Sequence, residues 1–295
     1  VGSGSHGAQT SRILKGVEKV LMKTKPKEIL VQGDTNTVIA GAIAASKLHI
    51  KVGHVEAGLR SYDRRMPEEI NRVVTDHISD HLFVPTENSR KNLLKEGISE
   101  EKIFMTGNTI VDSIYQNLEI SKRKVDPLSE LGLKEKSFIL LTSHRAENVD
   151  VKHRFQGIVK GVKLLKEATG MEIIYPIHPR SMKNIENFNL DTEGIRIIDP
   201  IGFLEFLQLE SSARIVLTDS GGVQEETCIL KTPCVTLREN TERPETIEIG
   251  SNVISGTAPD NILEFSLKMM DNRGEWDNPF GDGNSAKKIM DIISN

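Results

Sequence analysis

Short apolar runs alternate with helical patterns along the whole chain, and this alternation constrains the fold more than any other feature. Between the runs, segments such as 10–23 place Leu14, Val17 and Leu21 at helical spacing. Strands that alternate with helices predict βαβ units and a parallel sheet buried on both faces. The expected strands cover residues 28–32, 51–55, 81–85, 102–107, 137–142, 171–176, 195–199, 213–218 and 232–237.

The charged stretch 121–136 interrupts this alternation and predicts a linker or an exposed helix–loop between two α/β lobes. We expect doubly wound, Rossmann-like lobes over residues 1–120 and 121–279. A final helix at about 284–294 should follow the break at 278–283, so that residues 280–295 pack back on the first lobe. A length of 295 residues suits two ordinary domains.

Polar residues or glycine follow nearly every apolar run, as at 33–35, 56–58, 143–145, 178–180 and 219–222. Turn chemistry explains part of this pattern. The excess of Asp, Glu, His and Arg over plain turn-forming residues indicates a site, because open α/β sheets bind ligands beyond the carboxyl ends of their strands. Two such lobes predict one cleft between them.

Composition excludes several classes of protein. A net charge of −4 and few aromatic residues, 4% of the chain, argue against nucleic acid as a partner. No apolar run approaches the roughly 18 residues of a membrane helix, and no signal-peptide pattern occurs. Cys228 and Cys234 form neither a disulfide framework nor a zinc pattern, so a reducing, cytoplasmic setting is expected.

The stretch 54–72 combines proton-transfer groups with anion-binding groups. Glu56 follows an apolar run and precedes Ala-Gly, which places it at the sheet edge, where burial would suit it to acid–base work. Glu68 follows Pro67 at an expected helix start, where helix stabilisation is the alternative explanation for an acid. Four arginines surround the two acids: Arg60, Arg64, Arg65 and Arg72.

Two strand-to-helix turns are further candidates. At 218–226, Ser220, Gly221 and Gly222 open a helix whose first N–H groups could bind phosphate, and Glu225 or Glu226 could bind ribose. The alternative is a simple helix cap. The turn lacks the GxGxxG fingerprint, so no nicotinamide or flavin cofactor is indicated. At 32–37, Asp34 is either a cap or a cleft carboxylate, and Thr35 could cap the next helix.

Histidines and one more arginine complete the candidates. His144 and His178 lie at expected strand ends, and His144 is the better candidate for contact with an anion or for proton transfer. Arg243 could contact phosphate or sugar, or lie in a surface turn. His77 and His81 are four apart but lack the Glu of a zinc-protease helix, so no metal site is expected.

At these residues the chain resembles the non-hydrolysing UDP-N-acetylglucosamine 2-epimerases. The likeness runs from about Gln32 to the C-terminus, and its motifs keep the family's order. They are QGDTNT, HVEAGLR, PEEINR, FVPTENSRKNLL, TGNTIVD, TSHRAEN, TDSGGVQEE, TERPE and NPFGDG.

The resemblance implies a fold similar to the type B glycosyltransferases, with a UDP-sugar in the cleft, and interconversion of UDP-GlcNAc and UDP-ManNAc without a redox cofactor. It also implies a homodimer. By position in the motifs, the catalytic residues would be Asp34, Glu56, Glu68 and His144. The substrate-binding residues would be Arg72, His178, Ser220, Gly221, Gly222, Glu226 and Arg243.

The chain departs from the family at its start. It begins with Val1, followed by GSGSHG, which is typical of a loop or a vector remnant, and it has no opening strand with a Gly-Thr-Arg-Pro-Glu motif. The first lobe is therefore expected to be truncated. The alternatives are a hydrolysing epimerase that releases UDP and ManNAc, a glycosyltransferase, which the paired acids disfavour, or a UDP-sugar-binding fragment without catalysis.

Overall fold

The computed structural model describes residues 4–294 and divides into two compact units. Unit 1 contains the described residues up to Asp112 together with those from Phe280 onward, and unit 2 spans Ser113–Pro279. The helix α5 (Thr109–Lys124) contains the boundary. The lobe boundaries expected from the sequence, 1–120 and 121–279, stay a prediction. The two units are defined by their internal contacts, and a compact unit is not necessarily a functional lobe.

Unit 1 is built on a four-stranded parallel sheet in the order β1-β2-β3-β4. Gln32 pairs with Val55, and Val55 pairs with Phe83, so these strands reach the same edge of the sheet together. The residues that follow β1 and β2 are thereby brought side by side. The strands are β1 (Glu28–Gln32), β2 (Lys51–Val55), β3 (His81–Val84) and β4 (Ile103–Met105).

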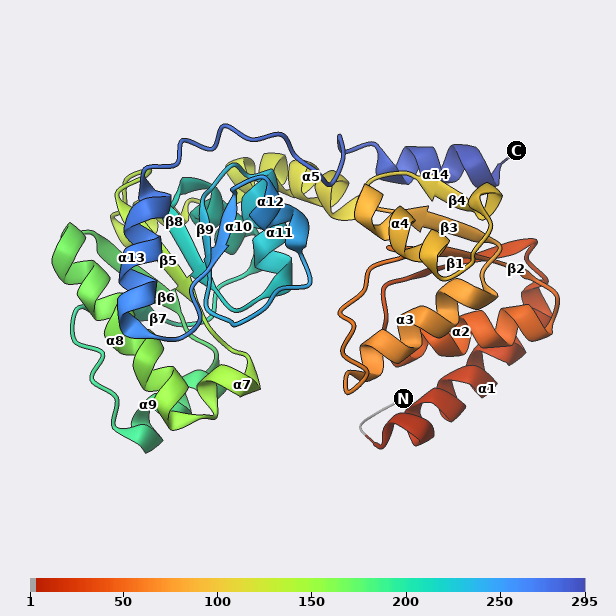
Figure 1. Cartoon of the computed structure of the whole chain (residues 1–295), viewed down its shortest axis with the longest axis horizontal. Helices are drawn as coiled ribbons and strands as arrows, with labels where there is room; N and C mark the ends of the chain where they lie inside the picture. Colours follow the sequence, from red (N-terminus) through yellow and green to blue (C-terminus); the bar gives the residue numbers. More distant parts are fainter. Residues whose placement is uncertain (1–3, 295) are drawn as a thin grey trace. The chain divides into compact units, whose positions relative to one another are not determined.

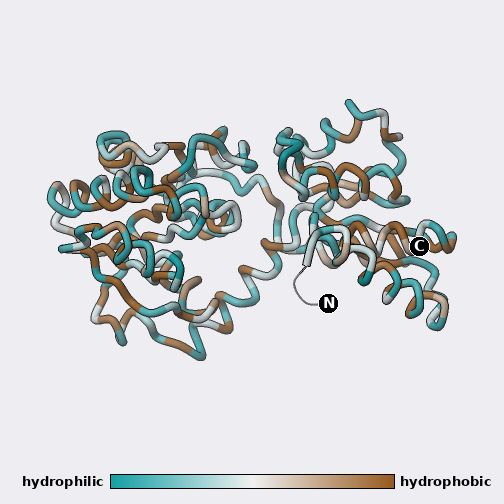
Figure 2. Tube along the Cα trace, turned by 90° about the horizontal axis from the view of Figure 1, so that it is seen from below, coloured by the Kyte–Doolittle hydropathy of each residue, from teal (hydrophilic) through white to brown (hydrophobic). Residues whose placement is uncertain are grey.

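Helices cover both faces of this sheet (Figure 1). Alternate residues of each strand face opposite sides: Val52 packs with Leu21 and the alanines of α2, whereas Val55 and Phe83 pack with Ile289 of the C-terminal helix. Figure 2 shows hydrophobic and hydrophilic residues alternating along the helices, as expected for helices with one buried face. Apart from α5, the helices are α1 (His6–Thr24), α2 (Asn36–Lys47), α3 (Pro67–Ile78), α4 (Glu87–Lys95), the 3₁₀ turn Glu100–Lys102, and α14 (Ser285–Ile293).

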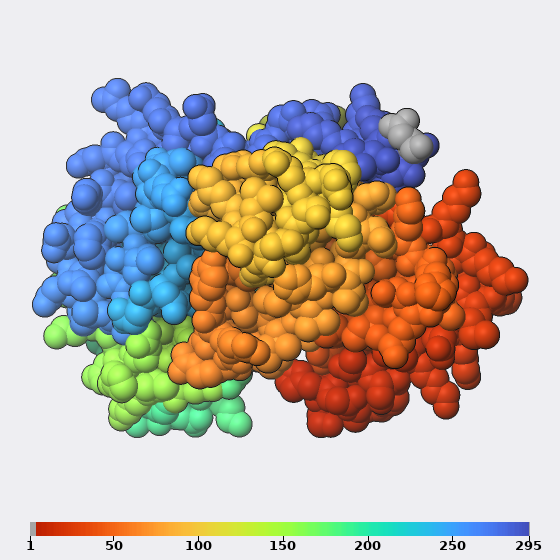
Figure 3. Space-filling model, turned by 45° about the vertical axis from the view of Figure 1, so that its right-hand side comes forward, coloured from red at the N-terminus to blue at the C-terminus, as the bar shows by residue number. Residues whose placement is uncertain are grey.

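The C-terminal helix α14 completes unit 1 although it is separated from the rest of the unit by all of unit 2. The backbone N–H groups of Ser285 and Ala286 donate to the Asp112 carboxylate, both at 3.1 Å. Ile289 is 3% exposed against Phe83. Figure 3 shows the blue C-terminal segment lying against the yellow and orange segments of the unit.

Unit 2 is a six-stranded, all-parallel sheet in the order β10-β9-β8-β5-β6-β7. The chain starts at β5, adds two strands on one side and then returns to add three on the other, which is a doubly wound sheet with a switch point between β5 and β8. Thr142 pairs with Thr218 at that point, so both strands end together. The strands are β5 (Phe138–Thr142), β6 (Glu172–Pro176), β7 (Ile195–Ile198), β8 (Ile215–Thr218), β9 (Cys234–Thr236) and β10 (Asn252–Ile254).

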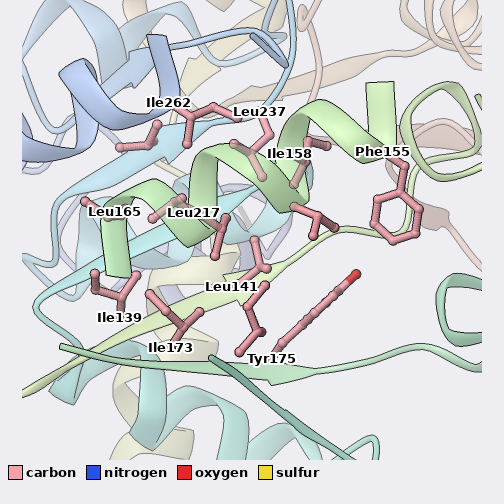
Figure 4. Close-up of a cluster of buried hydrophobic side chains, with 14 of the residues drawn as sticks. Ile139, Leu141, Phe155, Ile158, Leu165, Ile173, Tyr175, Leu217, Leu237 and Ile262 are labelled. Atoms are coloured by element: carbon pink, nitrogen blue, oxygen red, sulfur yellow. The ribbon is translucent and has the colours of Figure 1, made fainter. Parts of the chain in front are cut away.

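The larger core of unit 2 lies beneath the long helix α8. Figure 4 shows Phe155, Ile158 and Leu165 of this helix pointing toward strand residues that include Leu141 and Leu217. The helices are α6 (Pro127–Leu131), α7 (Ala146–Val149), α8 (Lys152–Thr169), α9 (Pro179–Phe188), α10 (Phe203–Ser212), α11 (Gly221–Ile229), α12 (Pro244–Glu248) and α13 (Pro259–Met270). None of the helices in residues 4–294 is both long and apolar enough to cross a membrane.

The structure differs at three places from what the sequence predicts. The stretch 121–136 is not wholly exposed, because Ser121 is buried and Leu133 packs in a core of unit 2. Strand β10 has only three residues and was not predicted. Of the loop expected at 2–7, residues 2 and 3 lie outside the described part, Ser5 caps α1, and His6 and Gly7 are already helical.

Candidate active site

Asp34, Glu56 and Arg72 come together at the carboxyl ends of β1 and β2. Arg72, on α3, forms an ion pair with the Asp34 carboxylate, and its other guanidinium nitrogen donates to the Glu56 carbonyl at 3.1 Å. The Asp34 side chain is 30% exposed and the Arg72 side chain 9%. One arginine thus links the two acid-bearing turns while the Asp34 carboxylate stays accessible.

The Glu56 backbone is held in a conformation that non-glycine residues seldom adopt. Its φ is 68°, in the left-handed region, which costs on the order of 1 kcal/mol or more. The bond from Arg72 fixes its carbonyl, and Gln32 Nε2 donates to Glu56 Oε1 at 2.9 Å. The conformation turns the chain immediately after β2 and holds the Glu56 carboxylate beside the end of β1.

Glu68 lies in the first turn of α3, one turn before Arg72, as its sequence position predicts. Its side chain is exposed and borders a pocket of about 430 Å³ that Thr35, Asn71 and α1 also line. Within residues 4–294, Glu68 forms no hydrogen bond or ion pair with Asp34 or Glu56. Thr35 occupies the cap position of α2, but its side chain makes no capping bond.

The other three arginines of the 54–72 stretch have different environments. Arg60 is buried and structural, because it forms ion pairs with Asp76 at 2.7 Å and with Glu96 at 2.7 Å. Arg65 is 91% exposed and pairs with its neighbour Asp63. Arg64 is exposed. Only Arg72 of the four lies beside the acids.

In unit 2, the fully buried Asp219 organises the switch point. Its carboxylate accepts hydrogen bonds from the Ser143 hydroxyl at 2.8 Å, from the N–H groups of His144 and Arg145 at 3.1 Å, and from the Asn148 amide at 3.1 Å. It therefore joins the turn after β8 to the turn after β5. His144 Nδ1 lies 3.4 Å from Asp219 Oδ1, and the His144 side chain is 45% exposed.

His144 and His178 border the same pocket, of about 200 Å³, at the ends of β5 and β6. The other walls include Pro176, Ile201 and Phe206, so the pocket is apolar apart from its two imidazoles, Thr142 and Ser143. His178 also caps α9, since its Nδ1 accepts from the Arg180 N–H at 3.2 Å. Its Nε2 is then the protonated nitrogen of the neutral ring.

The turn after β8 forms as the sequence indicates: Ser220 is the cap of α11 and accepts from the Val223 N–H. A Cβ on Gly221 would lie 3.8 Å from a Glu242 carboxylate oxygen, so an acid flanks this helix start. The buried Arg238 donates hydrogen bonds of 2.9 and 2.8 Å to the Glu242 carboxylate. Burial acts to raise the pKa of Glu242, but hydrogen bonding and the charge of Arg238 outweigh it, so the pKa is lowered.

The two neighbouring acids of α11 have different partners. Glu225 forms an ion pair with Arg243 Nε at 2.7 Å, with both side chains largely buried. Glu226 is partly buried beside Glu210 of α10, and burial raises the pKa of Glu226 above its ordinary value. Of the two candidates for a ribose contact, Glu225 is paired with an arginine, whereas Glu226 forms no arginine ion pair within residues 4–294.

Sequence reasoning missed three charged residues that shape these sites: Asp219, Arg238 and Glu210. Asp219 stood inside a recognised turn, and its position directly after a buried strand was a usable signal. Arg238 also follows a strand, but its acidic partners come from two separate segments, Glu147 from α7 and Glu242 from the loop before α12. Nothing in the sequence marks Glu210 as buried, because its segment has the composition of an ordinary amphipathic helix.

In the part of the chain that the structure describes, no group of three or more His, Cys, Asp and Glu side chains could hold a metal ion. His77 and His81 face different partners: His77 lies 3.8 Å from Glu96, and His81 bonds Glu28 at 2.7 Å.

Two parallel α/β units with charged side chains beyond their strand ends define a class of Rossmann-like proteins that includes glycosyltransferases. The fold is shared with a glycosyltransferase from Rickettsia africae, at 15% identity and a TM-score of 0.57, over 100% of this chain and 83% of that one. A family model described as UDP-N-acetylglucosamine 2-epimerase matches residues 1–294. The chain belongs to this family.

Individual relatives agree with this assignment. A UDP-N-acetylglucosamine 2-epimerase from Methanococcus maripaludis is 54% identical over 300 residues, which cover 99% of this chain and 82% of the relative. The crystal structure of Methanocaldococcus jannaschii UDP-GlcNAc 2-epimerase in complex with UDP-GlcNAc and UDP is 53% identical. It has a TM-score of 0.87 over 99% of this chain and 82% of that one.

Proposed function

We propose that the protein interconverts UDP-GlcNAc and UDP-ManNAc by epimerisation at C2, without release of free sugar. The observation that carries the proposal is the pairing of Asp34 with Arg72 beside Glu56, on a chain whose relatives bear the epimerase name. Epimerisation needs groups that remove and return a proton, and carboxylates at strand ends are suited to this work.

The proposed route is elimination followed by re-addition of UDP. The C2 hydrogen is not next to a carbonyl, so the C1–O bond to UDP must break as the proton leaves, and positive charge develops at C1. Carboxylates stabilise that charge. The C2–H and C1–O bonds are both lost, which leaves a 2-acetamidoglucal. A proton then returns to the opposite face of C2 and UDP adds back to C1.

We assign the catalytic roles to Asp34, Glu56, Glu68 and His144. Asp34 and Glu56 are supported by their shared anchor, Arg72, and His144 by the buried Asp219 behind its ring. Glu68 is supported by its motif position alone. Substrate-binding roles fall to Arg72, His178, Ser220, Gly221, Gly222, Glu226 and Arg243, with the phosphates at the start of α11. The apolar pocket beside His144 and His178 suits the uracil base.

The test is an NMR assay with UDP-GlcNAc in D2O, which follows deuterium entering C2 and the appearance of UDP-ManNAc. Replacing Glu56 or Glu68 by Gln should reduce deuterium exchange by at least about 100-fold, the scale of a lost acid or base. Glu101→Gln, the same change at an exposed residue just before β4, should leave exchange unaltered. Unchanged exchange in both the Glu56 and the Glu68 variants would contradict the proposal.

The same spectra separate the proposal from its alternatives. A hydrolysing epimerase would accumulate free ManNAc and UDP, whereas the proposed reaction reaches a mixture of two UDP-sugars. A fragment that only binds would show heat of UDP-GlcNAc binding by calorimetry and no turnover. The homodimer and the cytoplasmic setting stay predictions, and light scattering on the purified chain tests the first.

A further inference from the structure

His54 is a fully buried histidine of β2 that lies directly behind the Asp34 turn. Its Nδ1 is 2.6 Å from Asp76 Oδ1 on α3. Its Nε2 is 2.9 Å from the carbonyl oxygen of Gly33, the residue before Asp34. Both ring nitrogens therefore face oxygen atoms at hydrogen-bond distance, inside a site that excludes water.

The chemistry of the two partners determines the protons on the ring. A carbonyl oxygen can only accept, so Nε2 must carry hydrogen. Asp76 also receives the Gly58 N–H at 3.2 Å and the Arg60 guanidinium at 2.7 Å, both through Oδ2, so it is surrounded by donors in the way an ionised carboxylate is. Nδ1 then carries the second hydrogen.

We propose that His54 is a buried imidazolium at neutral pH and is the positioning residue that fixes the Gly33–Asp34 turn. The effect of His54 on activity rests on the proposed function. The protonation of the His54 ring is independent of that function.

The charges around the ring balance, which a buried cation requires. Asp76 adjoins the ring, Arg60 pairs with Asp76, and Glu96, directly after α4, accepts hydrogen bonds of 2.8 and 2.7 Å from Arg60. His54 and Arg60 thus contribute two positive charges, and Asp76 and Glu96 two negative ones. Within residues 4–294, the ion pair that joins His77 to this cluster is the one with Glu96, at 3.8 Å. Arg72 and Asp34 lie on the other side of Gly33.

The imidazolium is one of several groups that hold the Gly33–Asp34 turn. Gly33 has φ 81°, and its N–H donates to the Val55 carbonyl at 3.1 Å, while its carbonyl accepts from His54. The next carbonyl, of Asp34, accepts from Asn71 at 2.9 Å. A charged donor makes the bond to Gly33 shorter and about twice as strong as a neutral one. His54 therefore fixes the peptide before Asp34, while Arg72 and Asn71 hold Asp34 itself.

The test of protonation is a long-range proton–nitrogen NMR spectrum of the protein labelled with ¹⁵N-histidine. Between about pH 6.5 and 8.5, both His54 nitrogens should appear at protonated positions with both N–H protons visible. The ordinary imidazole, with a pKa of about 6.5, would lose one proton over this range, and the protein unfolded in urea provides that reference. A single protonated nitrogen at pH 8 would overturn the proposal.

Asp76→Asn tests whether the carboxylate causes the second proton. This variant keeps the shape of the side chain but removes its charge, so the Nδ1–H signal should disappear at pH 8 while the Nε2–H signal remains. Signals identical to those of the wild type would overturn the pairing. The wild-type spectrum decides the protonation of His54 even if this variant does not fold.

Activity tests the positioning role. His54→Gln should lower kcat by about 10- to 100-fold with little change in KM, because the acid is misplaced rather than removed. The matched control is His81→Gln, which breaks a His–Glu pair at the amino end of the same sheet and should leave both constants unchanged. Equal effects of the two variants would overturn the positioning role. If the wild type shows no epimerisation but two protonated nitrogens, the proposed function fails and the imidazolium stands.

Discussion

Ionisable side chains buried in the interior have pKa values that their surroundings shift, and Glu210 of α10 is a clear case. Its carboxyl group is fully buried beside Glu226. Burial first, and then the neighbouring Glu226 charge, raise the pKa of Glu210 well above its ordinary value. The folded protein therefore prefers Glu210 protonated, whereas the unfolded chain releases that proton at ordinary acidic pH.

This raised pKa predicts a pH-dependent gain from Glu210→Gln. The stability that protonated Glu210 provides is complete below the unfolded value of 4.5 and is lost as pH rises toward the folded value. Glutamine does not ionise, so the variant should unfold at higher urea concentration than the wild type at pH 8.5, with a smaller difference at pH 5. Each unit of pKa displacement is worth about 1.4 kcal/mol.

Glu264→Gln, at an exposed position of α13, is the matched control and should give the same small difference at both pH values. An equal gain for Glu210→Gln at pH 5 and pH 8.5 would mean that its ionisation does not limit stability.

The site residues show what could be predicted from the sequence at this scale. The positions of Asp34, Glu56 and His144 at strand ends followed from the alternation of runs, because parallel strands bring their carboxyl ends to one edge. Their ion pairs could not be predicted. Arg72 and Arg60 stand in the same stretch, 54–72, yet one faces Asp34 and the other is buried against Asp76, since α3 and the loop before it take different paths.

Among the elements, strands were easier to predict than the segments that join them. β1 and β2 have the expected bounds, because each is a complete apolar run between turn signals. The three-residue β10 and the four-residue α7 are too short for any periodicity. Asp219 holds α7 in place by accepting the Arg145 N–H just before it, a long-range contact that local sequence does not encode.

Two glycines give opposite predictions because their elements differ. Gly58, in the turn after β2, has φ 78°, and a Cβ there would lie 2.3 Å from the Ser89 carbonyl oxygen. Gly58→Ala should therefore destabilise the protein by more than about 2 kcal/mol. Gly16 lies exposed in α1 with nothing within 4 Å of a new Cβ. Gly16→Ala should stabilise it by about 0.5–1 kcal/mol.

Urea unfolding of the two alanine variants measures both effects with the same chemical change. A loss of similar size at the two positions would show that the environment of Gly58 is not what requires glycine there.

At the scale of the whole molecule, unit 1 is assembled from two distant parts of the chain. The apolar face of α14 closes the sheet face formed by Val55, Phe83 and Phe104. The helix was expected from its sequence, as was the alternation that builds each sheet. The order of the six strands in unit 2 could not be predicted, because apolar runs do not indicate on which side of the sheet the next strand is added.

Ile289→Ala should loosen unit 1 and leave unit 2 intact. Removing this buried side chain costs about 2–5 kcal/mol, and the cost falls on the sheet that α14 covers. Hydrogen exchange followed by mass spectrometry should show faster exchange in peptides around Phe83 and Phe104 and unchanged exchange in β5 and β8.

Met290→Ala, on the same helix but 52% exposed, is the control and should leave exchange in both units close to wild type. Faster exchange throughout unit 2 in the Ile289 variant would mean that the two units do not unfold separately.

The split of unit 1 has a consequence for how the protein is made. Translation delivers β1 to β4 first, then the whole of unit 2 without interruption, and only then the helix that covers Phe83. Domains generally fold as they emerge from the ribosome. The second unit can therefore finish while the first still exposes an uncovered apolar sheet face. The unit whose sheet is synthesised before unit 2 is therefore the unit that matures after it, and it is the unit that a chaperone would need to shield.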